Sequence, residues 1–218
     1  MEYWDSFKKN NEQLWHFDPK RTDQDYSFIG NLQTDFDDLL QLTENENAFK
    51  KIVLTDTIAT DNKDVLSRIQ GFKNWGYNEH NACTFQIFDD KYPEVFSRYN
   101  AFTNLESPTA FIVRQDPGQS IPWHYDTFFG YMKKNSLEDD KSICRYLIFL
   151  EDWEWGQAFL SGNSVVHQWQ RGDIIHIPYR MHHASCNVGM MPKFSLIITG
   201  IATEASLHNN QRPTYTLA

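Results

Sequence analysis

The sequence has little of what marks exported or membrane-bound proteins. It contains only three cysteines in 218 residues, Cys83, Cys144 and Cys186. Their number is odd and none form a C-x-x-C pair, which argues against a disulfide scaffold or a structural zinc site. No run approaches the roughly 18 uncharged apolar residues of a membrane helix. The first fifteen residues, MEYWDSFKKNNEQLW, lack the basic and apolar regions of a signal peptide. We therefore expect a cytoplasmic protein that does not span a membrane.

Positive charge is also scarce. Lysine and arginine together number 20 against 29 aspartates and glutamates, which gives a formal net charge of −9. No stripe of basic residues interleaved with aromatic ones reverses that sign locally, so a phosphate backbone would be repelled. We expect a small molecule or a protein side chain as the substrate, and no nucleic acid. The sequence does not indicate an oligomeric state.

Aromatic residues, in contrast, are abundant. They make up 15% of the chain, with 16 Phe, 10 Tyr and 7 Trp, and they predict a core rich in rings. The length fits one structural domain, and no linker, repeat or change of composition divides it. We expect a mixed α/β extension over residues 1–107 packed on a core of residues 108–203, with a tail over residues 204–218.

The extension shows short periodic segments. Helical spacing joins Val65, Leu66 and Ile69 after a possible cap at Asp61, and a second helical period runs over residues 92–99. Residues 52–57 and 84–88 have the composition of strands.

From residue 109 onward, short β-rich runs alternate with turn signals. The predicted strands span residues 109–115, 121–126, 143–151, 157–161, 164–169, 173–177, 182–188 and 193–201. Eight short strands of this kind are typical of a jelly roll, so the expected fold class is mainly β with flanking helices around a double-stranded β-helix, the cupin-like barrel. The insert 127–142, including Asp139 and Asp140, is expected to be a solvated loop.

The most informative stretch is Pro122-Trp123-His124-Tyr125-Asp126. In a strand, side chains two residues apart point to the same face, so His124 and Asp126 project together. An imidazole and a carboxylate on one face supply two legs of the two-histidine, one-carboxylate triad that binds Fe(II). The third leg is expected at His183 or at the neighbouring His182, and strand parity allows only one of them to face the metal. His167 and His176 are expected to be structural.

The motif order resembles that of the Fe(II)- and 2-oxoglutarate-dependent oxygenases. H-x-D is followed by Gly172-Asp173-Ile174-Ile175-His176-Ile177-Pro178, a histidine, and ten residues later a basic residue in Lys193-Phe194-Ser195. The similarity covers residues 109–201 and looks nearest to the branch that hydroxylates aspartyl, asparaginyl or prolyl groups. The spacing from Gly172 fits the family's distal histidine at His183, so we assign His124, Asp126 and His183 as the metal ligands.

This resemblance implies a hydroxylase that uses Fe(II), O2 and 2-oxoglutarate as co-substrate and releases succinate and CO2. The family usually binds the distal carboxylate of 2-oxoglutarate with an arginine on the strand after the distal histidine, because its planar fork suits a carboxylate. Here the matching position is Lys193, with Ser195 on the same strand face as a second donor and Arg145 as an alternative cation. A solvated charge at a strand edge is the competing interpretation of Lys193.

Two alternatives keep the barrel but change its use. One is a cupin-type metalloenzyme without 2-oxoglutarate, although cupins usually supply more histidines and a glutamate instead of H-x-D. The other is a non-catalytic barrel that binds a ligand and no metal.

Overall fold

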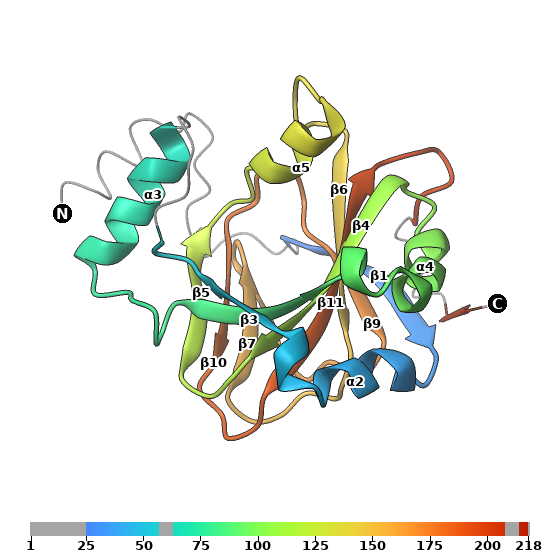
Figure 1. Cartoon of the computed structure of the whole chain (residues 1–218), viewed down its shortest axis with the longest axis horizontal. Coiled ribbons are helices and arrows are strands. Elements are labelled where there is room, and N and C mark those ends of the chain that lie inside the picture. Colours follow the sequence, from blue (N-terminus) through green and yellow to red (C-terminus); the bar gives the residue numbers. More distant parts are fainter. Residues whose placement is uncertain (1–24, 57–62, 208–213, 218) are drawn as a thin grey trace.

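The strand-rich second half of the chain folds into two β-sheets that face each other (Figure 1). The computed structural model describes residues 25–56, 63–207 and 214–217. The eight strands that build the barrel are β4 (Glu106–Gln115), β5 (Gln119–His124), β6 (Ile143–Phe149), β7 (Gln157–Ser161), β8 (Ser164–Val166), β9 (Asp173–His176), β10 (His183–Asn187) and β11 (Lys193–Ile201).

These strands alternate between the sheets in the manner of a double-stranded β-helix. The order β9-β6-β11-β4 forms the centre of the larger sheet, and β5-β10-β7-β8 forms the smaller one. All core pairs are antiparallel. Each of the eight predicted strands is present, and the expected fold class is confirmed.

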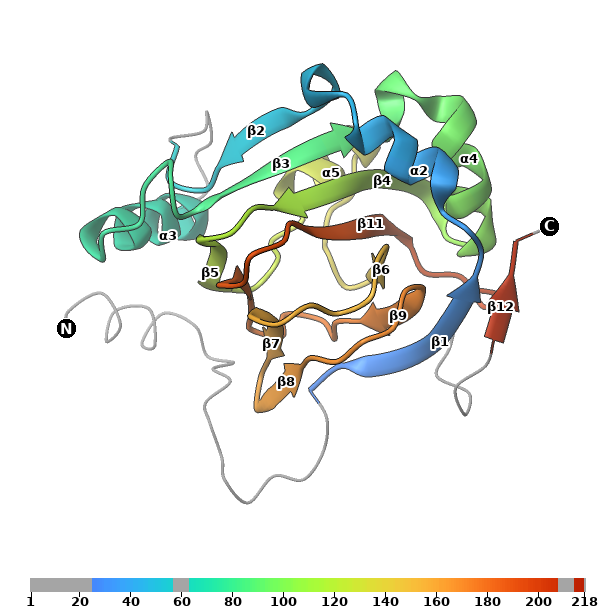
Figure 2. The ribbon, with the colours of Figure 1, turned by 90° about the horizontal axis from the view of Figure 1, so that it is seen from below.

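The remaining elements extend the larger sheet and cover it. They are β1 (Ser27–Gln33), α2 (Asp37–Thr43), the 3-10 turn η1 (Glu46–Ala48), β2 (Lys50–Val53), α3 (Lys63–Asn74), β3 (Cys83–Phe88), the 3-10 turn η2 (Asp89–Lys91), α4 (Pro93–Phe102), α5 (Phe129–Asn135) and β12 (Thr214–Thr216). β3 and β2 continue the sheet beyond β4, and β1 and β12 continue it beyond β9. Figure 2 shows α2 and α4 on the outer side of this sheet. Within residues 25–56 and 63–107, the strands β1, β2 and β3 are thus hydrogen-bonded into the larger sheet.

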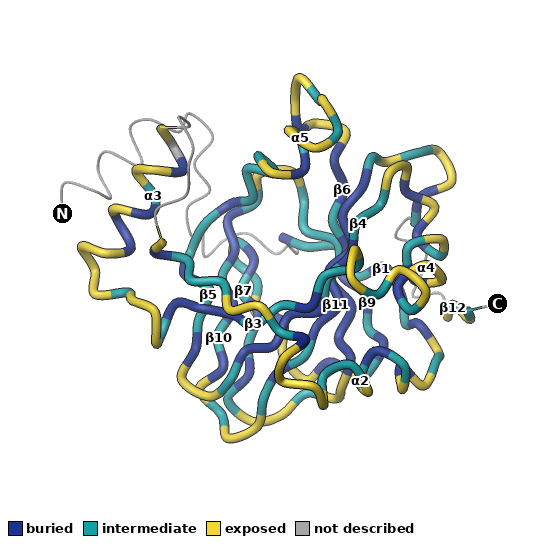
Figure 3. Tube along the Cα trace, in the orientation of Figure 1, coloured by how far each residue is buried: buried dark blue, intermediate teal, exposed yellow. Residues whose placement is uncertain are grey.

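Strand alternation buries the larger sheet on both faces. Leu147 and Phe149 point into the barrel, where Phe149 stacks on Trp169 with ring centroids 4.0 Å apart. Ile148, between them, points outward and packs with residues of α2 and α4. The two faces therefore have separate apolar clusters, as strand geometry requires. Figure 3 shows this burial along the strands, with exposed residues mainly in the loops and on the outer surface of the helices.

A glycine allows β1 to approach the barrel closely. Gly172 has a φ of 87°, a left-handed value that favours glycine, and its carbonyl accepts a hydrogen bond of 2.8 Å from the Leu32 N–H. A Cβ at this position would lie 2.3 Å from the Leu32 carbonyl oxygen. Gly172 thus precedes β9 as a turn residue and also permits the close packing of β1.

Several expectations for the flanking segments need correction. Helices occur where the periods of residues 65–69 and 92–99 predicted them, but the proposed cap at Asp61 lies outside the described residues. β1 and α2 were not predicted. The insert 127–142 contains α5, and Asp140 is buried instead of solvated. Its carboxylate accepts a hydrogen bond of 2.7 Å from the Tyr179 hydroxyl and pairs with Arg180, which compensates for the burial. No helix in the described part of the chain is long and apolar enough to cross a lipid bilayer.

Candidate metal centre

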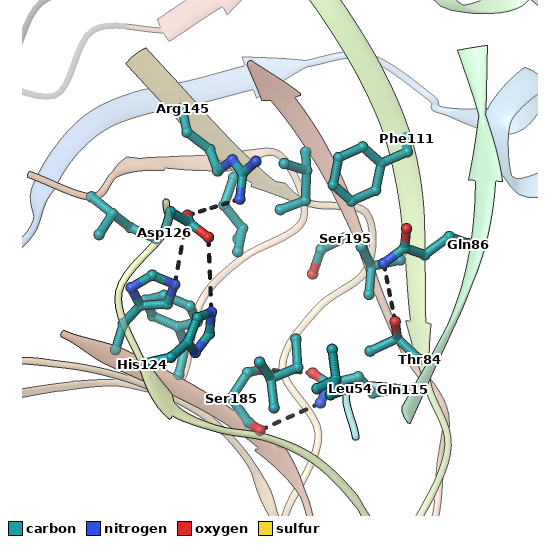
Figure 4. A pocket seen from close by; sticks show the side chains of 17 residues that line it. Leu54, Thr84, Gln86, Phe111, Gln115, His124, Asp126, Arg145, Ser185 and Ser195 are labelled. Carbon is teal, nitrogen blue, oxygen red and sulfur yellow. Dashed lines mark hydrogen bonds and ion pairs between the residues drawn. The ribbon is translucent and has the colours of Figure 1, made fainter. Parts of the chain in front are cut away.

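Three predicted ligands meet at one end of the smaller sheet. His124 is the last residue of β5 and His183 the first of β10, and the two are direct cross-strand partners with ring centroids 4.4 Å apart. Asp126 follows two residues after His124. Its Oδ1 lies 3.8 Å from His124 Nε2 and its Oδ2 lies 3.8 Å from His183 Nε2. One ligand atom from each of the three residues fits within 4.8 Å of the others. Figure 4 shows the carboxylate directed toward both rings.

Backbone carbonyls hold both imidazoles in the orientation that a metal needs. His124 Nδ1 lies 2.7 Å from the carbonyl oxygen of Pro122, and His183 Nδ1 lies 2.9 Å from that of Met181. A proton on each Nδ1 makes these hydrogen bonds and leaves the Nε2 lone pair directed at the shared point. Such outer partners are a regular feature of metal-binding histidines.

Asp126 is held by a cation on the neighbouring sheet. Arg145 Nη1 on β6 donates to Asp126 Oδ2 at 2.8 Å, and Arg145 Nε donates to the Thr199 hydroxyl at 2.9 Å. The carboxylate is therefore fixed by a charge-assisted hydrogen bond, with Oδ1 remaining for a metal.

The protonation states also suit a metal. Burial lowers the pKa of His124 to about 3 and also lowers the pKa of His183. Burial by itself would raise the pKa of Asp126, but Arg145 and the two histidines lower it well below its usual range. At neutral pH the histidines are neutral and Asp126 is ionised, which are the forms that bind metals.

His182 lies on the opposite side of the strand. Its ring is 5.2 Å from the Tyr125 ring and 6.3 Å from the Trp123 ring, centroid to centroid. Trp123 and Tyr125 alternate with His124 and Asp126, so they and His182 occupy the other face. The structure places His183, and not His182, beside the other two ligands.

A cavity of about 190 Å³ runs from the three ligands between the sheets. Its walls are largely apolar, with Leu147, Phe159 and Ile197 among them. Away from the ligands its lining becomes polar, through Gln86, Gln115, Ser185 and Ser195, as Figure 4 shows. Apolar walls with a few converging polar groups are the lining expected of a small-molecule site.

Lys193 lies behind the polar end of this cavity. The residue is only 5% exposed, which overturns the interpretation as a solvated charge at a strand edge. Its ammonium donates to the Ser185 hydroxyl and, at 3.4 Å, to the carbonyl of Ala158. Burial lowers the pKa of Lys193 to about 7. Within the described ranges no carboxylate forms an ion pair with it.

Sequence reasoning missed the polar residues Ser185 and Gln115, which connect the cavity with Lys193. Ser185 donates to Gln115 Oε1 at 2.6 Å, and Gln115 is the cross-strand partner of Lys193. Ser185 follows His183 by two residues, so strand alternation could have predicted that it faces the cavity. Gln115 and Thr199 are brought to the site by long-range pairing, for which the sequence carries no local signal.

Comparisons with known proteins give little further information. No protein-family model matches the chain, and no curated protein matches it. A predicted oxalate decarboxylase from Thermotoga maritima is 11% identical over 55% of this chain and 82% of that chain, with a TM-score of 0.35. A cupin-superfamily sugar phosphate isomerase from Silicibacter pomeroyi is 12% identical over 55% of this chain and 60% of that chain, with a TM-score of 0.36. A cupin 2 conserved barrel domain protein from Salinispora arenicola is 13% identical over 46% of this chain and 68% of that chain, with a TM-score of 0.32.

These structural similarities are too low to support a fold assignment, which follows instead from the strand order described above. Fold and site together define a double-stranded β-helix protein with a two-histidine, one-carboxylate cluster suited to a metal ion.

Proposed function

We propose that this protein is a non-haem oxygenase that uses Fe(II), 2-oxoglutarate and O2 to hydroxylate an unactivated C–H bond. The substrate would be an amino acid, a small metabolite or a protein side chain, and the co-products would be succinate and CO2. On motif order we place the chain nearest to the aspartyl, asparaginyl and prolyl hydroxylases. The observation that carries the proposal is one cavity with a metal-ligand cluster at one end and the buried Lys193 ammonium behind the other.

The three ligands fit Fe(II) by the chemistry of their donor atoms. Two neutral imidazoles and one carboxylate, all on one side of the shared point, form the facial arrangement that leaves neighbouring metal positions open. His124 and His183 would bind through Nε2, and Asp126 through one carboxylate oxygen. When bound, the iron and 2-oxoglutarate supply the oxidising chemistry, and the chain binds, orients and shields the reactants.

The polar end of the cavity fits the distal carboxylate of 2-oxoglutarate. A buried ammonium without an anionic partner is costly, and a bound carboxylate would compensate it. Ser185, which contacts the Lys193 ammonium, lines the cavity and would share in the contact, as would Ser195 two residues along β11 from Lys193. Arg145 is already engaged by Asp126 and Thr199, which favours Lys193 over Arg145 for this role.

An anaerobic titration of the metal-free protein with Fe(II) and 2-oxoglutarate tests the proposal. A chelated Fe(II)–2-oxoglutarate pair gives a weak metal-to-ligand charge-transfer band in the visible spectrum. We expect this band in the unmodified protein and in His182→Ala, and its loss in His124→Ala. Iron binding without the band would favour a cupin-type metalloenzyme instead, and binding of neither would indicate a non-catalytic barrel.

A further inference from the structure

The cavity beside the metal centre is lined by two separate pairs of polar side chains. Ser185 and Gln115 form one pair, which is connected to Lys193 because the ammonium donates to the Ser185 hydroxyl. Gln86 and Thr84 on β3 form the other pair, in which Gln86 Nε2 donates to Thr84 Oγ1 at 3.1 Å. All four side chains line the cavity, and Figure 4 shows the β3 pair across from the metal ligands. No hydrogen bond between described residues joins one pair to the other.

We infer that Gln86 and Thr84 recognise the primary substrate through a primary carboxamide, the CONH2 group of an amino-acid side chain or of another small molecule. Lys193 and its neighbours would then be left for 2-oxoglutarate. The inference rests on the proposed function, because it assigns the second polar pair of a cavity whose first pair serves the co-substrate.

Gln86 faces the cavity and has hydrogen-bonding atoms that the fold does not use. It is the cross-strand partner of Val113, which also lines the cavity, so strand geometry directs both side chains to the inside. One N–H of its amide is bound to Thr84, whereas Oε1 and the second N–H have no hydrogen-bond partner within residues 25–56, 63–207 and 214–217. Thr84 is only 1% exposed, so it anchors the amide from the buried side.

One acceptor and one donor on the same amide are matched best by a second amide. A carboxylate has no donor for Gln86 Oε1, and an ammonium has no acceptor for the second N–H, so either would leave one polar atom unpaired. A primary carboxamide can accept from the N–H of Gln86 while it donates to Oε1, because one of its own N–H groups lies on the same side as its carbonyl. A peptide group cannot do both, because its trans geometry places N–H and C=O on opposite sides.

The remaining lining of the cavity also favours a small uncharged group. Apart from the three metal ligands and Arg145, which pairs with Asp126 at 2.8 Å, the described residues that line the cavity are uncharged. A charged group placed against Gln86 would therefore lose its hydration without meeting a counter-charge. The volume of about 190 Å³ is below the about 300 Å³ at which sites for drug-sized ligands begin. Beside the co-substrate, the cavity thus has room for a group of a few atoms, such as a carboxamide.

The test uses the full chain loaded with Mn(II) and N-oxalylglycine, a non-reacting analogue of 2-oxoglutarate. Bound Mn(II) speeds the proton relaxation of a small molecule that lies close to it. The probes are propionamide, which is a primary amide, its isomer N-methylacetamide, which is a secondary amide and almost entirely trans, and the charged counterparts propionate and propylammonium.

We expect a saturable effect on propionamide that is absent when Zn(II) replaces Mn(II). The Kd of propionamide should be about 2- to 10-fold lower than that of N-methylacetamide, the range of one neutral hydrogen bond, and lower than that of either charged probe. Equal or tighter binding of N-methylacetamide, propionate or propylammonium would overturn the inference.

Variants of Gln86 identify the group that reads the amide. Gln86→Met keeps an unbranched side chain of similar length and should abolish the preference for propionamide over N-methylacetamide. Gln86→Glu keeps the shape but lacks the donors, so it should bind propylammonium more tightly than propionamide. The matched control is Gln70→Met, because Gln70 is exposed on α3, where it donates to Asn74 at 2.8 Å, and should leave the preference unchanged. An unchanged preference in Gln86→Met would contradict the assignment.

Binding of Mn(II) and of N-oxalylglycine is measured first, in each protein. If the unmodified protein binds Mn(II) and not N-oxalylglycine, the proposed function fails and the inference falls with it. If Gln86→Met loses affinity for N-oxalylglycine by the same factor as for propionamide, Gln86 serves the co-substrate and only the inference is overturned. The same relaxation measurement with a peptide in which one glutamine carries the sole primary amide distinguishes a protein side chain from a free small molecule as the source of the carboxamide.

Discussion

Replacing Lys193 by methionine removes the buried ammonium group and keeps an unbranched side chain of similar length. The change leaves the hydrogen bond from Ser185 to Gln115 intact, because Lys193 donates to Ser185 and is not part of that bond. The variant then lacks the charge and the two hydrogen bonds that the ammonium donates to Ser185 and to the Ala158 carbonyl. If Lys193 serves 2-oxoglutarate, this variant should gain stability and lose co-substrate affinity at the same time.

The expected gain in stability follows from the pKa of Lys193, which burial lowers from 10.5 to about 7. At about 1.36 kcal/mol for each pH unit, keeping the group protonated inside the folded protein costs at most roughly 5 kcal/mol. The unfolded chain holds this proton up to about pH 10.5 and the folded chain only up to about pH 7. The cost is therefore complete below pH 7 and shrinks as the pH rises toward 10.5.

Imperfect packing of the methionine thioether will offset part of the stability that is gained by removing the ammonium. We expect Lys193→Met without metal or co-substrate to be more stable than the unmodified protein by at least about 1 kcal/mol at pH 6, which is a rise in Tm of about 2–4 °C for a domain of this size. The gain should be smaller at pH 9. The loss of a charged hydrogen bond should weaken the binding free energy of 2-oxoglutarate by about 1.5–3 kcal/mol. This corresponds to a Kd that is roughly 10- to 150-fold higher.

Thermal unfolding at both pH values, with and without saturating 2-oxoglutarate and Mn(II), measures both effects. Lys91→Met is the matched control, because Lys91 is exposed in η2 and should change neither stability nor co-substrate affinity. A Lys193→Met protein that is no more stable than the unmodified one at pH 6 would show that the ammonium is not buried at a cost. An unchanged Kd for 2-oxoglutarate would assign the distal carboxylate to another residue.

Three further changes test the metal centre and its surroundings. Arg145→Gln should weaken metal binding about 10- to 100-fold in an anaerobic Co(II) titration, which is the usual cost of losing an outer partner of a ligand. Arg145→Lys should restore part of this affinity. Equal affinities in the unmodified protein and both variants would contradict the role of Arg145 in holding Asp126. His183→Ala should abolish Co(II) binding and His182→Ala should leave it within a few fold, and the reverse result would exchange the two roles. Burial lowers the pKa of His124, His182 and His183, so stability without metal should be greatest above about pH 6.5 and should fall as the pH drops below it, measured by urea unfolding between pH 5 and 8; a flat profile would mean that these rings are accessible to protons in the folded state.

Local pattern was sufficient to predict the barrel. Short β-rich runs and turn residues identified all eight core strands, because strand alternation and turn chemistry are written in neighbouring residues. The same logic failed for β1, whose partners β9 and β12 are more than a hundred residues away in sequence. It also failed for Asp140, since nothing near that position shows that Tyr179 and Arg180 lie beside it.

In the candidate site, too, some residues follow from local spacing in the sequence and others only from long-range packing. His124 and Asp126 follow from a spacing of two in one strand, and the rejection of His182 follows from parity once the strand start is known. The depth of Lys193 could not be predicted, because a lysine at the start of a strand is exposed or buried according to what faces it. Here Ser185 and Ala158 face it from the opposite sheet, and only the closure of the barrel brings them there.

The groups assigned to function are also groups that are expensive to bury. Two imidazoles held neutral and a carboxylate balanced by one arginine line a single cavity, and behind it lies a lysine with no anionic partner among the described residues. The Lys193 ammonium costs stability in the absence of a ligand and would be compensated by a carboxylate. The two imidazoles and Asp126 offer donor atoms that a metal ion would occupy. Ligands that supply those charges should therefore stabilise the fold in proportion to the groups they satisfy, by mass action. Fe(II) or Mn(II) together with 2-oxoglutarate should stabilise more than the sum of either alone, because the metal creates the second contact of the co-substrate. A merely additive stabilisation would mean that the two ligands do not meet in this cavity.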